Sequence, residues 1–82
     1  MVLLAGTFAR TVSGYVKDKG GDPLPGVNIV IKGTSTGVVS DVNGYSTINV
    51  PEGKVSLVFS FIGYKQQAVE IKESKTLAIV ME

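Results

Sequence analysis

Carboxylates are the first candidates for chemistry in this chain, because its 82 residues include no histidine and no cysteine. That composition excludes a Ser-His-Asp arrangement, a cysteine nucleophile and a thiolate metal site. The acids are Asp18, Asp22, Asp41, Glu52, Glu70, Glu73 and Glu82. All but Glu70 and Glu82 border predicted turns, and those two lie on strand faces expected to be wet. Acids in such places are usually solvated, so we predict no catalytic residue.

Two polar loops each resemble part of a different ligand-binding motif. Residues 41–44 (DVNG) begin like a calcium loop, but the further oxygen ligands and the terminal glutamate do not follow. We interpret this segment as an Asx-type turn. Residues 33–37 (GTSTG) are rich in hydroxyls but lack the lysine and the strand-to-helix setting of a phosphate-binding loop. We therefore predict neither a metal site nor a cofactor site.

The three tyrosines could form a surface for stacking sugars or for contacting a protein partner. Tyr15 lies opposite the apolar face of its strand, and Tyr45 and Tyr64 border turns. We favour a structural interpretation, in which each ring packs over a sheet edge and keeps its hydroxyl in water.

The strongest structural signal is strict alternation in residues 54–64 (KVSLVFSFIGY). Val55, Leu57, Phe59 and Phe61 point to one face, which is the pattern of a strand with one side in a core. This face carries two of the three phenylalanines. We therefore predict that it is the central strand, against which the others pack.

Six further short strands are predicted from apolar alternation between turns rich in glycine and proline. They cover residues 11–18, 27–32, 38–41, 46–50, 65–72 and 75–81. Pro25-Gly26 suits the centre of a type II turn, and Asn43-Gly44 predicts a hairpin. A two-residue hairpin loop would pair Val39 with Ile48 on the core side, whereas a bulged loop would place Val38 there. Seven evenly spaced strands favour an antiparallel sandwich or a small barrel.

Length and charge restrict the function classes further. The chain is long enough for one small domain with a two-layer core. Eight basic and seven acidic residues give a net charge of +1, which is too balanced for a nucleic-acid partner or a polybasic membrane patch. The absence of cysteine fits both the cytosol and a periplasm.

Residues 1–9 (MVLLAGTFA) are apolar, end in small residues and are too few to span a bilayer. They are similar to the end of a secretory signal peptide cleaved after Ala9, although a charged n-region is missing. A disordered or tag-derived leader and a first strand are the alternatives. If the segment is a signal remnant, the mature domain, residues 10–82, is exported.

The order of motifs resembles a known family. PLPGVNIVIKGT (residues 23–34), DVNG (residues 41–44) and LVFSFIGY (residues 57–64) follow one another as in the carboxypeptidase-regulatory-like domain. That domain stands at the N-terminus of SusC/RagA-type TonB-dependent outer-membrane receptors of Bacteroidetes. The resemblance covers residues 11–82. One departure concerns Tyr45, since the family places an aromatic at the position of Ser46. Either a bulge compensates, or Tyr45 turns outward.

The resemblance implies a seven-stranded, antiparallel Greek-key sandwich of the transthyretin (prealbumin) type, located in the periplasm. It implies a non-catalytic accessory domain that contacts the plug and barrel of its parent receptor, or periplasmic proteins, during glycan uptake. The domain itself would not cross the membrane, and no pattern selects an oligomeric state. The alternatives are a carbohydrate- or peptide-binding module and a regulatory or folding domain of an exported hydrolase.

Overall fold

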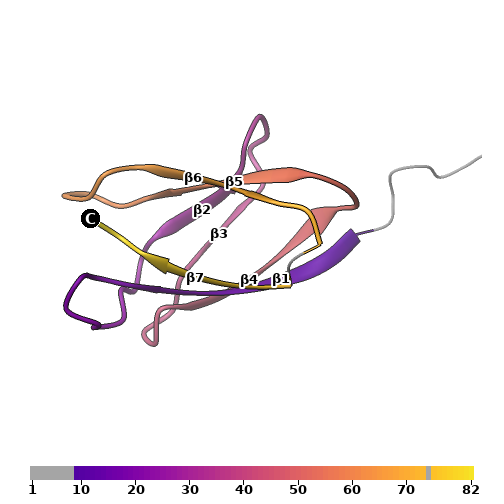
Figure 1. Ribbon diagram of the computed structural model, residues 1–82. Helices are drawn as coiled ribbons and strands as arrows, with labels where there is room; N and C mark the ends of the chain where they lie inside the picture. Colours follow the sequence, from indigo (N-terminus) through magenta and orange to yellow (C-terminus); the bar gives the residue numbers. More distant parts are fainter. Residues whose placement is uncertain (1–8, 74) are drawn as a thin grey trace, which may run out of the picture.

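The computed structural model describes residues 9–73 and 75–82, which form two packed β-sheets (Figure 1). The strands are β1 (Ala9–Lys17), β2 (Asn28–Ile31), β3 (Gly37–Val39), β4 (Tyr45–Pro51), β5 (Val55–Ser60), β6 (Gln67–Ile71) and β7 (Thr76–Val80). Within these ranges no helix is long and apolar enough to cross a membrane. The predicted leader lies outside the described residues except for Ala9, which begins β1. The prediction of an all-β sandwich with seven strands is confirmed for the described part of the chain.

Three strands form one sheet in the order β4-β1-β7, and four form the other in the order β3-β2-β5-β6. The expectation of wholly antiparallel pairing is wrong at one place, since β1 and β7 run parallel from Ser13↔Thr76 to Lys17↔Val80. Parallel neighbours need a long connection rather than a tight turn. Here that connection is the rest of the domain, because β1 and β7 are the first and last strands.

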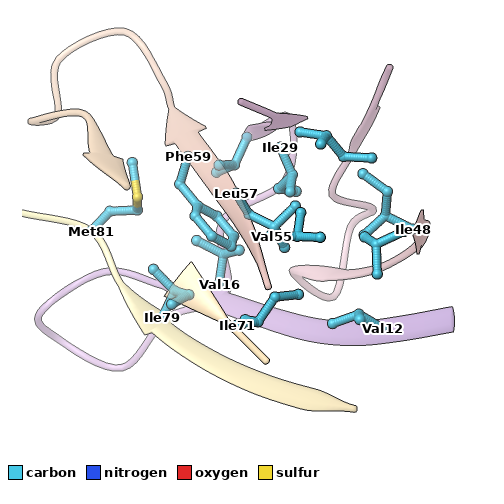
Figure 2. Packing of buried hydrophobic residues seen from close by; sticks show 13 residues of the cluster. Val12, Val16, Ile29, Ile48, Val55, Leu57, Phe59, Ile71, Ile79 and Met81 are labelled. Atoms are coloured by element: carbon cyan, nitrogen blue, oxygen red, sulfur yellow. The ribbon is translucent and has the colours of Figure 1, made fainter. Parts of the chain in front are cut away.

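The core lies between the sheets and is built by alternate residues of each strand, as Figure 2 shows for side chains from both sheets. The fully buried side chains include Val12, Val16, Leu57 and Phe59. Strand β5 is flanked by β2 and β6, so the predicted central strand is an inner strand of its sheet. Residues beyond Ser60 leave the strand, and Phe61 packs only partly buried against the core.

The predicted hairpin at Asn43-Gly44 is wrong in its strand pairing. The turn forms, since Gly44 N donates to Asp41 O at 2.8 Å and Asp41 N donates to Tyr45 O at 2.9 Å. However, β3 pairs with β2 and β4 pairs with β1, so this turn carries the chain from one sheet to the other. Val38 turns toward the core and Val39 is 57% exposed.

Three connections gather at the end of the sandwich where β1 ends, together with Glu82 (Figure 1). They are the β1–β2 loop, the β3–β4 turn and the β5–β6 turn. Hydrogen bonds join them to the strand ends: Leu24 N donates to Val16 O at 3.0 Å, and Lys65 N donates to Glu82 O at 2.6 Å. We call this the loop end of the sandwich.

Candidate functional site

Two of the three aspartates at the loop end, Asp18 and Asp41, use their carboxylates to hold turns. Asp41 Oδ1 accepts from the backbone N–H of Asn43 at 2.9 Å and of Tyr45 at 3.0 Å, which confirms the predicted Asx-type turn. Asp18 Oδ1 does the same for Gly20 N at 2.8 Å and Asp22 N at 3.0 Å. Both carboxylates therefore stabilise local backbone through side chain–backbone bonds.

The other acids lie on the surface. Asp22, Glu52, Glu73 and Glu82 are exposed, and Glu70 forms an exposed ion pair with Lys54 at 3.8 Å. Among residues 9–73 and 75–82, no three or more potential metal-binding side chains come together. Asp18 and Glu82 both border a second open hollow of about 370 Å³ at the loop end, where Asp18 Oδ1 is bonded to its own turn and Glu82 is exposed.

The hydroxyl-rich loop between β2 and β3 closes on itself. Thr34 Oγ1 donates to Ile31 O at 2.9 Å and accepts from Thr36 N at 3.0 Å. Its neighbour Ser35 is exposed. The predicted polar loop is a short turn between two strands of one sheet.

Tyr15 and Tyr45 lie side by side on the outer face of the three-stranded sheet. Their ring centroids are 4.9 Å apart at an interplanar angle of 49°, and Tyr45 Oη contacts Ser13 Oγ at 3.3 Å. Ser46 takes the inward position in β4, and Tyr45 therefore turns outward. Of the two explanations for the shifted aromatic residue, a compensating bulge or an outward Tyr45, the second is confirmed. The expectation of a sheet-edge position is wrong for Tyr15, since β1 is the middle strand.

Tyr64 has a different environment from the other two tyrosines. Its ring stacks on Phe61 with centroids 5.8 Å apart and an interplanar angle of 22°. Both rings are partly buried and pack against the core cluster. Tyr64 therefore covers the core at the loop end, and this role agrees with the structural interpretation of the aromatic residues.

An open groove of about 450 Å³ lies next to the exposed tyrosine, where the sheet meets the loop end. It is lined by Tyr15, Val16, Lys17, Gly21, Pro23, Asn43 and Ala78. Tyr15 is 52% exposed, and Ala78 is exposed on the neighbouring strand. A ring, an amide and an ammonium border this hollow, so it is suited to contact with a ligand or a side chain.

Sequence reasoning missed the role of Ser40, which is 5% exposed. Its hydroxyl donates to Leu24 O at 2.7 Å and accepts from Val27 N at 2.9 Å, so it is inserted into the Pro25-Gly26 turn. Gly26 has the positive φ of 84° that this turn requires. The available signal was the alternation after Val38, which places Ser40 on the inward side.

Comparison with known proteins gives concordant results. The chain is 38% identical over 71 residues to the TonB-dependent receptor P39 of Formosa agariphila, covering 87% of this chain and 7% of the receptor. It is 38% identical over 79 residues to the TonB-dependent receptor SusC of Bacteroides thetaiotaomicron, covering 87% of this chain and 8% of that receptor. The chain thus spans less than a tenth of the length of these relatives.

Solved structures share the fold. One match is a chain in a crystal structure of a type II cohesin–X-dockerin complex from Acetivibrio cellulolyticus. The TM-score is 0.69 at 27% identity, over 88% of this chain and 56% of that chain. The family model of the CarboxypepD_reg-like domain matches residues 12–82, which is nearly the whole described structure. The chain therefore belongs to the CarboxypepD_reg-like domain family.

Proposed function

We propose that this chain is a non-catalytic accessory domain on the periplasmic side of a TonB-dependent outer-membrane receptor. In this proposal it folds as a unit ahead of the plug and barrel, and it mediates contacts with them or with periplasmic proteins during glycan uptake. The observation that carries the proposal is the match to receptors of which this domain makes up 7–8%. The transport step belongs to the remainder of such a receptor, which leaves a contact role for the domain.

Two further observations support a contact role. Asp18 and Asp41 hold turns at the loop end rather than facing a pocket as a pair. The structural match belongs to a protein described as part of a cohesin–X-dockerin complex, so a similar fold occurs in an assembly between proteins. We include in the proposal the Greek-key, transthyretin-like topology and an exported domain of residues 10–82. Four connections that cross between the sheets support this topology.

Deletion of the domain from its parent receptor tests the contact role. We expect slower growth on the glycan that the receptor imports, with or without a lower receptor level in the outer membrane. A parent carrying an exposed-loop substitution, Ser35→Ala, is the matched control, because Ser35 is exposed. Unchanged growth together with an unchanged receptor level after deletion would contradict the proposal.

A carbohydrate-binding module is the second candidate, and the exposed ring of Tyr15 beside the groove favours it. Aromatic rings with nearby amide groups suit the apolar faces and hydroxyls of sugars. Calorimetry of the domain with oligosaccharides, compared with its Tyr15→Ala variant, separates the two candidates. Affinity weaker than about 1 mM for every sugar, with no difference between the proteins, removes this one.

A further inference from the structure

The four edge strands of the sandwich differ in how they are protected against pairing with another chain. Natural edges are kept short or carry charges and prolines. Strand β3 has three residues, β4 ends at Pro51, and β6 carries the exposed Glu70. Strand β7 reads TLAIV and contains no charge, proline or glycine. Among the described strands, it is therefore the edge with the least protection.

The backbone of β7 presents hydrogen-bonding groups on its free side. Ser13 N donates to Lys75 O and Met81 N donates to Lys17 O, both at 2.8 Å. Since backbone groups alternate in direction along a strand, the odd-numbered residues of this strand face β1 and the even-numbered residues face away. In the described ranges β7 pairs with β1 alone, so the N–H and C=O groups of Thr76 and Ala78 point to the free side of the edge.

The C-terminal part of the same edge is already covered. Gln67 Nε2 donates to Val80 O at 2.8 Å, and Lys65 N donates to Glu82 O at 2.6 Å. The amide of Gln67 thus stands where the N–H of a neighbouring strand would lie. These bonds also show that β6 and β7 border the same side of the sandwich (Figure 1).

The side chains along this side are incompletely covered. Leu77 on β7 and Val69 on β6 pack against the core cluster but are only partly buried, whereas Ile71 is 1% exposed. On the outer face, Val80 is 39% exposed and Ala78 borders the groove beside Tyr15. An extra strand along β7 would cover both sets, because its side chains alternate between the two faces.

We propose that the free edge of β7 binds an extended polypeptide segment by strand addition. The segment pairs with Thr76 and Ala78, turns one apolar side chain toward Leu77, and lays a larger apolar side chain across Ala78 into the groove. A second copy of this chain fits less well, because the C-terminal part of its own β7 edge is already bonded at Val80 O and Glu82 O, whereas an extended segment offers a fully unpaired backbone. This inference deepens the proposed contact role by naming its surface and the chemistry of its partner.

Amide hydrogen exchange of the domain, with and without a short synthetic peptide of alternating threonine and valine, tests this assignment. We expect the amides of Thr76 and Ala78 to exchange fast in the free domain and to slow by roughly tenfold or more with peptide. Two peptide versions, each N-methylated on alternate residues, form the chemical control. One version should lose binding, because the added strand must donate from one set of N–H groups only.

Two proline variants locate the site. Ala78→Pro removes an N–H from the proposed edge, and we expect peptide binding to weaken about tenfold or more. Ala68→Pro on β6 is the matched control. Lys32 N donates to Ser56 O, so the even-numbered residues of β5 face β2, and Ala68, which lies opposite Val58, faces away from β5. This variant should therefore bind as the wild type does. Circular dichroism checks that both variants fold. If either proline variant is unfolded, the two N-methylated peptides still test whether the peptide pairs with the β7 edge of the wild-type domain.

Three results would overturn the proposal. The first is that about 1 mM peptide does not slow amide exchange at Thr76 and Ala78, and the second is that amide exchange slows only in β3, β4 or β6. The third is that both N-methylated peptides bind equally well. Protection of Ala78 that rises with the concentration of the free domain would assign the edge to a second copy instead. This assay uses the domain alone, so its failure would leave the growth test of the accessory role unaffected.

Discussion

Replacing Ser40 with alanine removes the hydroxyl that joins the β1–β2 loop to the end of β3. This hydroxyl accepts from Val27 N at 2.9 Å and donates to Leu24 O at 2.7 Å. Val27 is fully buried, so water cannot replace the lost acceptor without opening the loop. The variant therefore leaves a buried N–H without a partner at the point where the chain enters β2.

The expected loss of stability is the sum of two parts. An unsatisfied buried donor costs about 1–3 kcal/mol, and the lost bond to the half-buried Leu24 carbonyl adds about 0.5–1.5 kcal/mol. The sum is about 1.5–4.5 kcal/mol in the free energy of unfolding. For a domain of this size, that corresponds to a fall in Tm of roughly 6–36 °C.

Urea unfolding followed by circular dichroism measures this difference, since the chain contains no tryptophan. Ser46→Ala is the matched control. Ser46 is 9% exposed, and within the described ranges its hydroxyl has no hydrogen-bond partner, so we expect a change of about 0.5 kcal/mol or less. Equal stability of the two variants would refute the reasoning. The loss of a buried hydroxyl would then explain both free-energy changes, whether or not the hydroxyl forms hydrogen bonds.

Four other substitutions give measurable outcomes. Phe59→Ala empties the middle of the core and should cost about 3–5 kcal/mol, leaving the domain largely unfolded by circular dichroism; melting within a few degrees of wild type would contradict this. Gly44→Ala should abolish folding, because Gly44 has φ of 74° and a Cβ there would overlap Val16 O. Gly63→Ala meets open space at φ of 90° and should cost only about 1–2 kcal/mol in urea unfolding; similar losses for both glycines would count against the steric argument. Glu70→Gln breaks an exposed ion pair and should change stability by less than about 1 kcal/mol, and a larger loss that persists in 1 M salt would show that the pair is not solvated.

Local pattern determined which residues face the core. Val55, Leu57 and Phe59 alternate with polar or smaller residues, and all three are buried because the side-chain period of a strand is two. The inward side of β1 was predictable for the same reason. In the same way, the Asx-type turn at Asp41 follows from side-chain chemistry within a few residues.

The pairing between strands was harder to predict from the sequence. Asn43-Gly44 specifies a reversal of the chain, but it contains no information on whether the next strand joins the same sheet. The parallel contact of β1 with β7 joins the two ends of the domain and has no local signal. The candidate surfaces depend on these pairings, so neither the groove beside Tyr15 nor the free edge of β7 could be placed before the sheets were known.

The parallel arrangement of the first and last strands has a mechanical consequence. A pull applied between the start of β1 and the end of β7 runs along both strands in opposite directions. From Ser13↔Thr76 to Lys17↔Val80, the hydrogen bonds between them would share that load rather than open one after another. Under tension between its two ends, the domain should therefore behave as a stiff link that yields at a threshold force, not as a spring that unravels gradually.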